Sequence, residues 1–144
     1  MQSFYGKTAV VTGAASGIGR AIAKRCAQYD MRVVLADIDQ SALNKTENDL
    51  RSVGADVLAI LTDVSKPDDV ETLAQKTLYH FGNVHLLFNN AGVATGSTIW
   101  DSTLDDWEWV VGVNMWGVIH GLRVFVPIMI DQDTECHIVN TASV

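Results

Sequence analysis

Three glycines within residues 8–20, TAVVTGAASGIGR, constrain this chain more than any other feature of its sequence. An apolar run at residues 9–11 leads into Gly13, Gly17 and Gly19, and apolar residues then recur at helical spacing. This order predicts a buried strand, a tight turn and a helix. Glycine lets the backbone approach a ligand closely, and the free N–H groups at a helix N-terminus favour an anion. The segment therefore predicts a phosphate-binding turn.

The spacing of these glycines is G-x-x-x-G-x-G, which differs from the common dinucleotide fingerprint G-x-G-x-x-G. The segment shares the strand, glycine turn and helix of that fingerprint but not the spacing of its glycines. A glycine-rich turn without a ligand is therefore the alternative at this point.

Composition restricts the kinds of partner. A chain of 144 residues, 48% of them hydrophobic, can bury one core. Its net charge of −7, without a cluster of Lys and Arg, disfavours nucleic acid and anionic membranes as partners. We expect a cytoplasmic protein, because no signal-like N-terminus and no run of about 18 apolar residues is present. The spacing of Cys26, Cys136 and the histidines predicts free thiols and no metal site.

Further apolar runs predict four more strands, separated by helical patterns. The strands are expected at residues 31–37, 56–61, 85–88 and 137–141, and the helices at residues 41–53, 65–81 and from about 103 to Pro127. Pro127 is expected to kink or end the last helix. This alternation predicts an α/β fold with a doubly wound parallel sheet, in one domain over residues 1–144 that stops after the fifth strand. Ligands bind such sheets at the carboxyl ends of the strands, which here carry Gly13, Asp37, Asp63, Asn90 and Ser143.

Asp37 lies at the end of the second predicted strand, 18 residues after Gly19 (37 − 19). An acid at this place can accept hydrogen bonds from the ribose hydroxyls of an adenosine. The next residue is Ile38 and not Arg, so a 2′-phosphate would face a carboxylate, and such like-charge contacts cost several kcal/mol. We therefore expect NAD as the cofactor in preference to NADP. A solvated acid at a strand end is the alternative.

Taken together, these motifs resemble the short-chain dehydrogenase/reductase family. The matching motifs are T-G-x-x-x-G-I-G at residues 12–19, Asp63-Val64, the NNAG run at residues 89–92, Asn114 in V-N-x-x-G, and N-x-x-S at residues 140–143. The resemblance covers essentially the whole chain, and the glycine spacing is the family's own. It implies a Rossmann fold and an enzyme that transfers hydride between a nicotinamide cofactor and an alcohol or ketone substrate.

The resemblance also implies roles for individual residues. The implied cofactor-binding residues are Gly13, Ser16, Gly17, Ile18 and Gly19 at the pyrophosphate, Asp37 at the ribose, Asp63 and Val64 at the adenine, and Asn90, Ala91 and Gly92 on the wall toward the nicotinamide. Ser143 would hydrogen-bond the substrate oxygen, and Asn114 would hold a water of the proton relay. Asn is unfavourable within a helix and Asn114 falls on the apolar stripe, so a role in packing alone would be strained. A buried amide satisfied by the backbone is the alternative.

The family's catalytic Tyr-x-x-x-Lys pair is the main departure. None of Tyr5, Tyr29 and Tyr79 has a Lys four residues later. These 144 residues alone would lack general acid–base assistance of about 10²–10⁴-fold, so we expect the N-terminal part of a longer single-domain enzyme. The alternatives are a truncated dinucleotide-binding module without turnover and a structural partner domain.

Four tryptophans gather in and before the last predicted helix, at positions 100, 107, 109 and 116. In the family this helix faces a partner subunit, so the resemblance implies a homo-oligomer, a tetramer by analogy. Core packing is the equal alternative for these side chains, and Trp100 is a candidate to border the substrate.

Overall fold

The computed structural model describes residues 3–143. Its elements are, in order, β1 (Thr8–Thr12), α1 (Gly17–Gln28), β2 (Arg32–Asp37), α2 (Gln40–Ser52), β3 (Val57–Leu61), α3 (Pro67–Phe81), β4 (Leu86–Asn89), α4 (Leu104–Val111), η1 (Gly112–Trp116), α5 (Gly117–Asp131) and β5 (His137–Asn140). The predicted α/β alternation is confirmed, and each strand begins and ends within one residue of its predicted bounds.

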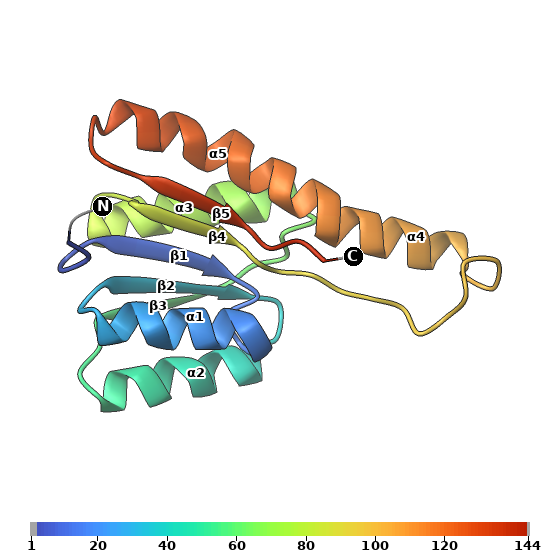
Figure 1. Cartoon of the computed structure of the whole chain (residues 1–144), viewed down its shortest axis with the longest axis horizontal. Coiled ribbons are helices and arrows are strands. Elements are labelled where there is room, and N and C mark those ends of the chain that lie inside the picture. Colours follow the sequence, from blue (N-terminus) through green and yellow to red (C-terminus); the bar gives the residue numbers. More distant parts are fainter. Residues whose placement is uncertain (1–2, 144) are drawn as a thin grey trace.

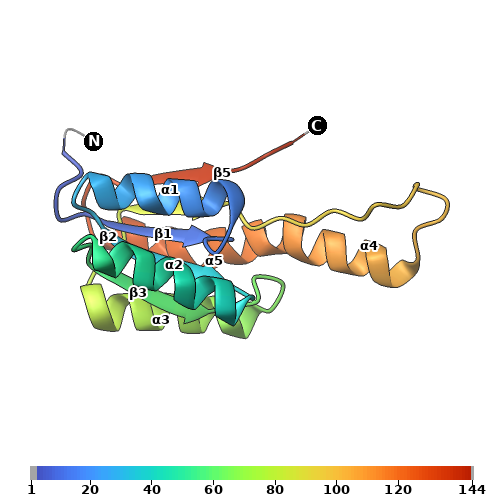
Figure 2. The same cartoon turned by 90° about the horizontal axis from the view of Figure 1, so that it is seen from below.

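The five strands form one parallel sheet in the order β3-β2-β1-β4-β5. Helices α1 and α2 cover one face of the sheet, and α3 and α5 cover the other (Figures 1 and 2). The chain moves from β1 outward to β3 and then returns to the other side of β1 with β4. The direction of winding therefore reverses between β1 and β4, which is where sheets of this kind bind their ligands.

Alternate residues of the inner strands pack into two separate cores. Val11 joins the core beneath α1 and α2 with Leu43, whereas Val10 joins the core beneath α3 and α5 with Leu73 and Phe125. All five of these side chains are fully buried. Because β1 and β2 are covered on both faces, they appear in the sequence as continuous apolar runs.

Helices α4, η1 and α5 follow one another without a break, and Figure 1 shows them as one long helix. The expectation that Pro127 could end this helix is wrong, because α5 passes through Pro127 and ends at Asp131. Proline removes a single helical hydrogen bond, and the helix is held on either side by Phe125 and Met129, which are buried against the sheet. By length and composition alone the helix could cross a membrane, but core helices of soluble proteins pass the same test.

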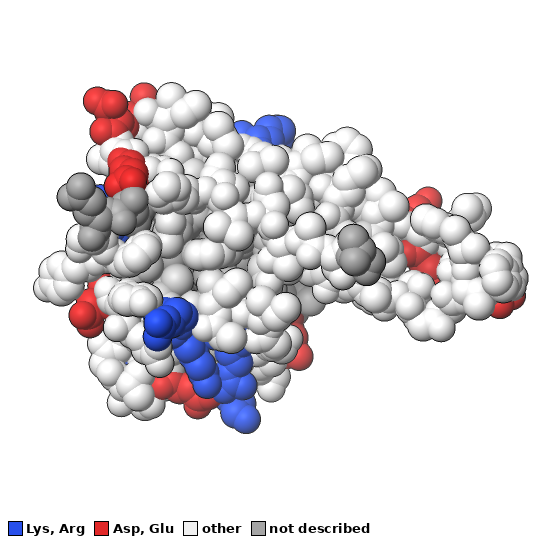
Figure 3. Space-filling view, in the orientation of Figure 1, with Lys and Arg blue, Asp and Glu red and all other residues white. Residues whose placement is uncertain are grey.

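Strand β5 lies at one edge of the sheet and is largely exposed, with 44% of Val139 accessible. Figure 3 shows few charged side chains over this part of the surface, whereas Lys and Arg gather over α1 and α2. Within the described residues, β5 is paired with β4 on one side and forms the edge of the sheet on the other.

His85 closes the pairing of β1 with β4. The imidazole Nδ1 of His85 accepts a hydrogen bond from the Thr8 backbone N–H at 3.0 Å, and the backbone N–H of His85 donates to the Thr8 carbonyl at 2.8 Å. Burial lowers the pKa of His85 below its ordinary value of 6.5, and the nearby charges of Lys7 and Arg32 add to this effect. The imidazole therefore serves the fold in its neutral form, since protonation would remove the acceptor.

We expect mild acid to destabilise the fold through His85. The unfolded chain binds the proton at higher pH than the folded chain, so the contribution of neutral His85 is complete above about pH 6.5 and is lost as the pH falls from there toward the folded pKa. The urea concentration at the unfolding midpoint should be lower at about pH 5.5 than at about pH 7.5. His85→Asn keeps an acceptor that does not titrate and should flatten this dependence. Equal pH dependence in the two proteins would contradict the assignment.

Candidate active site

A cleft of about 520 Å³ opens at the carboxyl ends of the inner strands, where the winding reverses. It is lined by Gly13, Ser16, Gly17, Ile18, Gly19, Asp37, Ile38, Thr62, Asp63, Val64, Ser65, Asn90, Ala91, Gly92, Val93, Trp109, Val113 and Thr141. Its size suits a small molecule. The structure thus brings every residue predicted to bind the cofactor into one cleft, although that binding itself stays a prediction.

The glycine turn between β1 and α1 is built by close backbone contacts. A Cβ on Gly19 would lie 2.0 Å from the Gly13 carbonyl oxygen, and one on Gly13 would lie 2.9 Å from the Ala91 Cα. Gly17, at φ +49°, instead has nothing within 4 Å of its Cβ position. Ser16 caps α1 without a side-chain hydrogen bond to the helix. The first N–H groups of α1 therefore have no side-chain cap at the cleft, which suits a phosphate.

Thr12 fastens this turn to the end of β4. Its hydroxyl accepts hydrogen bonds from the N–H groups of Asn90 and Ala91, both at 3.0 Å, and donates to the Phe88 carbonyl at 3.2 Å. The Asn90 side chain returns a hydrogen bond to the Thr12 carbonyl at 3.1 Å. Thr12 was not among the predicted site residues, and its place as the first residue of T-G-x-x-x-G-I-G was the signal that could have identified it.

Asp37 is held at the cleft by the turn itself. One carboxylate oxygen accepts from the Ala15 N–H at 2.9 Å and the other from the Asp39 N–H at 3.1 Å. A carboxylate has about four acceptor sites, so capacity remains for two hydroxyl groups of a ligand. Ile38 follows in the lining and adds no cation beside this carboxylate.

Asp63 shapes the turn that follows β3. Its carboxylate accepts from the Ser65 hydroxyl at 2.6 Å and from the Ser65 N–H at 3.0 Å, and Lys66 lies 3.5 Å away. Burial alone would raise the pKa of Asp63, but the hydrogen bonds from Ser65 and the charge of Lys66 outweigh it and lower that pKa below 3.8. Asp63 is therefore ionised at neutral pH, and the turn presents Val64 to the cleft.

Asn114 lies in η1, one turn of π-helix within the long helix. Its amide accepts from the Val93 N–H at 2.8 Å and donates to the Val93 carbonyl at 2.9 Å. The expectation of a place on the apolar stripe is wrong, because Asn114 is exposed. The alternative of a buried amide satisfied by the backbone is wrong about burial, although the Val93 backbone does pair with both amide atoms. The widened turn directs this side chain sideways, to the segment that follows β4.

Neither residue predicted to be catalytic lines the cleft. Asn114 adjoins it, since its Oδ1 lies 3.5 Å from the Cβ position of Gly92. Ser143 lies three residues beyond β5 and is exposed, while Thr141 of the same segment is part of the lining. The catalytic roles of Asn114 and Ser143 therefore stay predictions.

Trp109 and Val113 are lining residues that the sequence analysis did not identify. Their spacing of four residues places them on one face of the helix, but the sequence cannot tell which face meets the cleft. The alternative that the four tryptophans pack in the core is wrong, because each of their side chains is at least 44% exposed. Trp100 is 80% exposed and lies outside the cleft lining.

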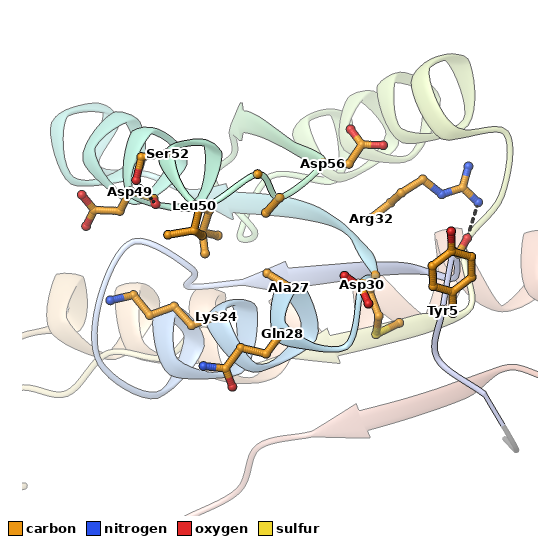
Figure 4. Close-up of a pocket in the computed structure, with 15 residues that line it drawn as sticks. Tyr5, Lys24, Ala27, Gln28, Asp30, Arg32, Asp49, Leu50, Ser52 and Asp56 are labelled. Carbon is orange, nitrogen blue, oxygen red and sulfur yellow. Dashed lines mark hydrogen bonds between the residues drawn. The ribbon is translucent and has the colours of Figure 1, made fainter.

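A larger cavity of about 1110 Å³ lies at the opposite end of the sheet, between α1 and α2 (Figure 4). Charges of both signs line it, among them Lys24, Asp56 and Arg32. The Arg32 guanidinium is used by the fold, since it donates to the carbonyls of Gly6 at 2.7 Å and Phe81 at 3.1 Å. The guanidinium of Arg32 therefore serves the fold at this cavity.

Comparison with known proteins identifies the family of this chain. A profile of the short chain dehydrogenases matches residues 7–144. The chain belongs to the short-chain dehydrogenase/reductase family. The predicted resemblance is confirmed.

Among solved structures, a short-chain dehydrogenase/reductase from Burkholderia phymatum in complex with NAD is 55% identical, with a TM-score of 0.97 over 99% of this chain and 51% of its own. The CLA biosynthesis dehydrogenase/reductase of Lactiplantibacillus plantarum is 38% identical over 144 residues, which is 50% of its length. The 1-deoxy-11-beta-hydroxypentalenate dehydrogenase of Streptomyces avermitilis is 42% identical over 138 residues, 94% of this chain and 51% of the relative. The chain thus spans about half the length of these relatives.

Proposed function

We propose that this chain is the dinucleotide-binding part, residues 1–144, of an NAD-dependent oxidoreductase that acts on an alcohol or ketone. The observation that carries this proposal is the Asp37 carboxylate, fixed at the cleft by two backbone N–H groups and followed by Ile38. The NAD in the structure of the Burkholderia relative supports the same cofactor.

The residues present fit such a cofactor. The glycine turn and the N-terminus of α1 would hold the pyrophosphate, Asp37 the adenosine ribose, and Asp63 with Val64 the adenine. Nicotinamide, when bound, supplies hydride donor and acceptor chemistry. Ser143 would then hydrogen-bond the substrate oxygen, and Asn114 would hold a relay water beside the segment that it fastens. By family analogy we also propose a cytoplasmic homo-oligomer in which the exposed tryptophans of the long helix contribute to an interface.

Two measurements on the natural full-length protein test this function. Fluorescence titration should show NADH binding at least about 100-fold tighter than NADPH, because a 2′-phosphate would face Asp37. A screen of secondary alcohols should then show reduction of NAD by absorbance at the nicotinamide band. Preference for NADPH would contradict the cofactor assignment. NADH binding without turnover of any alcohol or ketone would indicate a non-catalytic dinucleotide-binding module instead.

A further inference from the structure

We propose that His120 is a positioning residue for the adenine end of the cleft and acts through the Val64 carbonyl. The proposal rests on the proposed function, since Val64 matters here as part of the cofactor site. It assigns a task to a buried histidine of α5 that the hydride chemistry does not use. His120 does not itself line the cleft.

Two glycines bring α5 unusually close to the ends of the strands. A Cβ on Gly117 would lie 2.7 Å from Val64 Cγ2, and a Cβ on Gly121 would lie 2.2 Å from the Asn89 side-chain oxygen. The two glycines are four residues apart and so share one face of the helix. Side chains at these positions would push α5 away from the turn after β3 and from the end of β4.

His120 lies within this close contact. It is 8% exposed, and its Nδ1 lies 2.9 Å from the Val64 carbonyl oxygen. A carbonyl oxygen only accepts, so we assign the proton to Nδ1. The Trp116 ring packs beside the imidazole with the ring centroids 5.8 Å apart. The imidazole thus connects α5 to the Val64 carbonyl in the turn after β3.

The Val64 carbonyl depends on the His120 donor, because the polar groups of the neighbouring Asp63 already form hydrogen bonds with other residues. The Asp63 carboxylate turns back to Ser65, and the Asp63 N–H donates to the Asp69 carboxylate at 2.9 Å. Val64 is itself 8% exposed, so little water reaches it. Without the His120 donor the carbonyl would be buried with no hydrogen-bond partner. The turn would then lower its free energy by moving outward, where water can donate to the carbonyl. The Val64 side chain, which lines the cleft, would move with it.

The matched variants are His120→Leu and His120→Asn, which have nearly the same size and shape. Asn places an amide N–H where Nδ1 stands, and Leu places a methyl group there. We expect His120→Leu to raise the Kd for NADH about tenfold and to speed amide exchange at residues 62–66 about tenfold, with the amides of β1 unchanged. His120→Asn should restore both quantities to within about threefold of the natural protein. His80→Leu, at an exposed histidine, is the control and should change neither.

Each outcome decides the proposal. Equal behaviour of the Leu and Asn variants, whether both are intact or both unfolded, would overturn it, because the proposal requires a donor at the Nδ1 position and Asn alone supplies one. Faster exchange over the whole chain in His120→Leu would also overturn it, since that marks a general loss of packing. Amide exchange needs no cofactor. If the natural protein did not bind NADH, the proposed function would fail, while exchange at residues 62–66 would still show whether His120 holds the Val64 turn.

Discussion

Gly19→Ala is expected to abolish measurable NADH binding, with a loss of at least about 100-fold, or about 2.7 kcal/mol. The new Cβ would lie 2.0 Å from the Gly13 carbonyl oxygen and 2.6 Å from Asn90 Nδ2. The first of these atoms belongs to the backbone and cannot rotate away, so the turn between β1 and α1 must open. Overpacking of this kind also destabilises a fold by about 1–3 kcal/mol. NADH titration and urea unfolding measure the two effects separately.

The control for this variant is Gly96→Ala. Gly96 lies in the loop before α4, its φ is not in the left-handed region, and nothing stands within 4 Å of its Cβ position. The same methyl group should therefore leave both the NADH affinity and the urea midpoint within the scatter of the natural protein. If Gly19→Ala bound NADH as tightly as Gly96→Ala, the glycine turn would not be the phosphate site.

Asp37→Asn is expected to lower the preference for NADH over NADPH about 100-fold, or about 2.7 kcal/mol. The substitution removes the carboxylate charge that a 2′-phosphate would meet. It keeps an amide oxygen that can still accept from the Ala15 N–H, whereas the amide nitrogen cannot accept from the Asp39 N–H, so one of the two hydrogen bonds that hold residue 37 is kept and one is lost. Titration with both dinucleotides gives the ratio of their Kd values, which is insensitive to the fraction of protein that is folded.

Asp39→Asn is the matched control for charge. Asp39 lies two residues further on and caps α2 by accepting from the Ala42 N–H at 3.0 Å, a role that Asn fills equally well. This variant loses the same charge at almost the same place but not at the ribose, and the ratio should stay within about threefold. An equal change of the ratio in the two variants would mean that general electrostatics, and not Asp37, sets the preference.

The local sequence determined the elements and the cleft. Buried parallel strands need continuous apolar runs, and residues 9–11 and 33–36 are such runs, so β1 and β2 could be predicted almost to the residue. The glycine turn could be predicted because close backbone contact excludes every side chain at Gly13 and Gly19. The carboxyl ends of parallel strands meet at one edge, so Asp37, Asp63 and Asn90 could be gathered without knowledge of the strand order.

The long helix shows where local reasoning ends. Its periodicity predicts a buried stripe but not the π-turn at η1, because one widened turn rotates the residues that follow it without changing their apolar character. Asn114, which lies within this turn, contacts Val93 instead of lying within the core. Pro127 did not end α5, because tertiary packing of its neighbours outweighed a local preference.

The amino-acid sequence alone specified which segments form strands and helices, where the glycine turn lies and which acid ends β2. These properties depend on backbone geometry and on burial, which act over a few residues. Only the tertiary structure decided what His120, Trp109 and Asn114 contact. The partners of His120 and Asn114 lie 56 and 21 residues away along the chain, and the packing of the long helix sets both contacts. Gly117 and Gly121 allow that close approach, and no local pattern specifies which carbonyl the helix will meet.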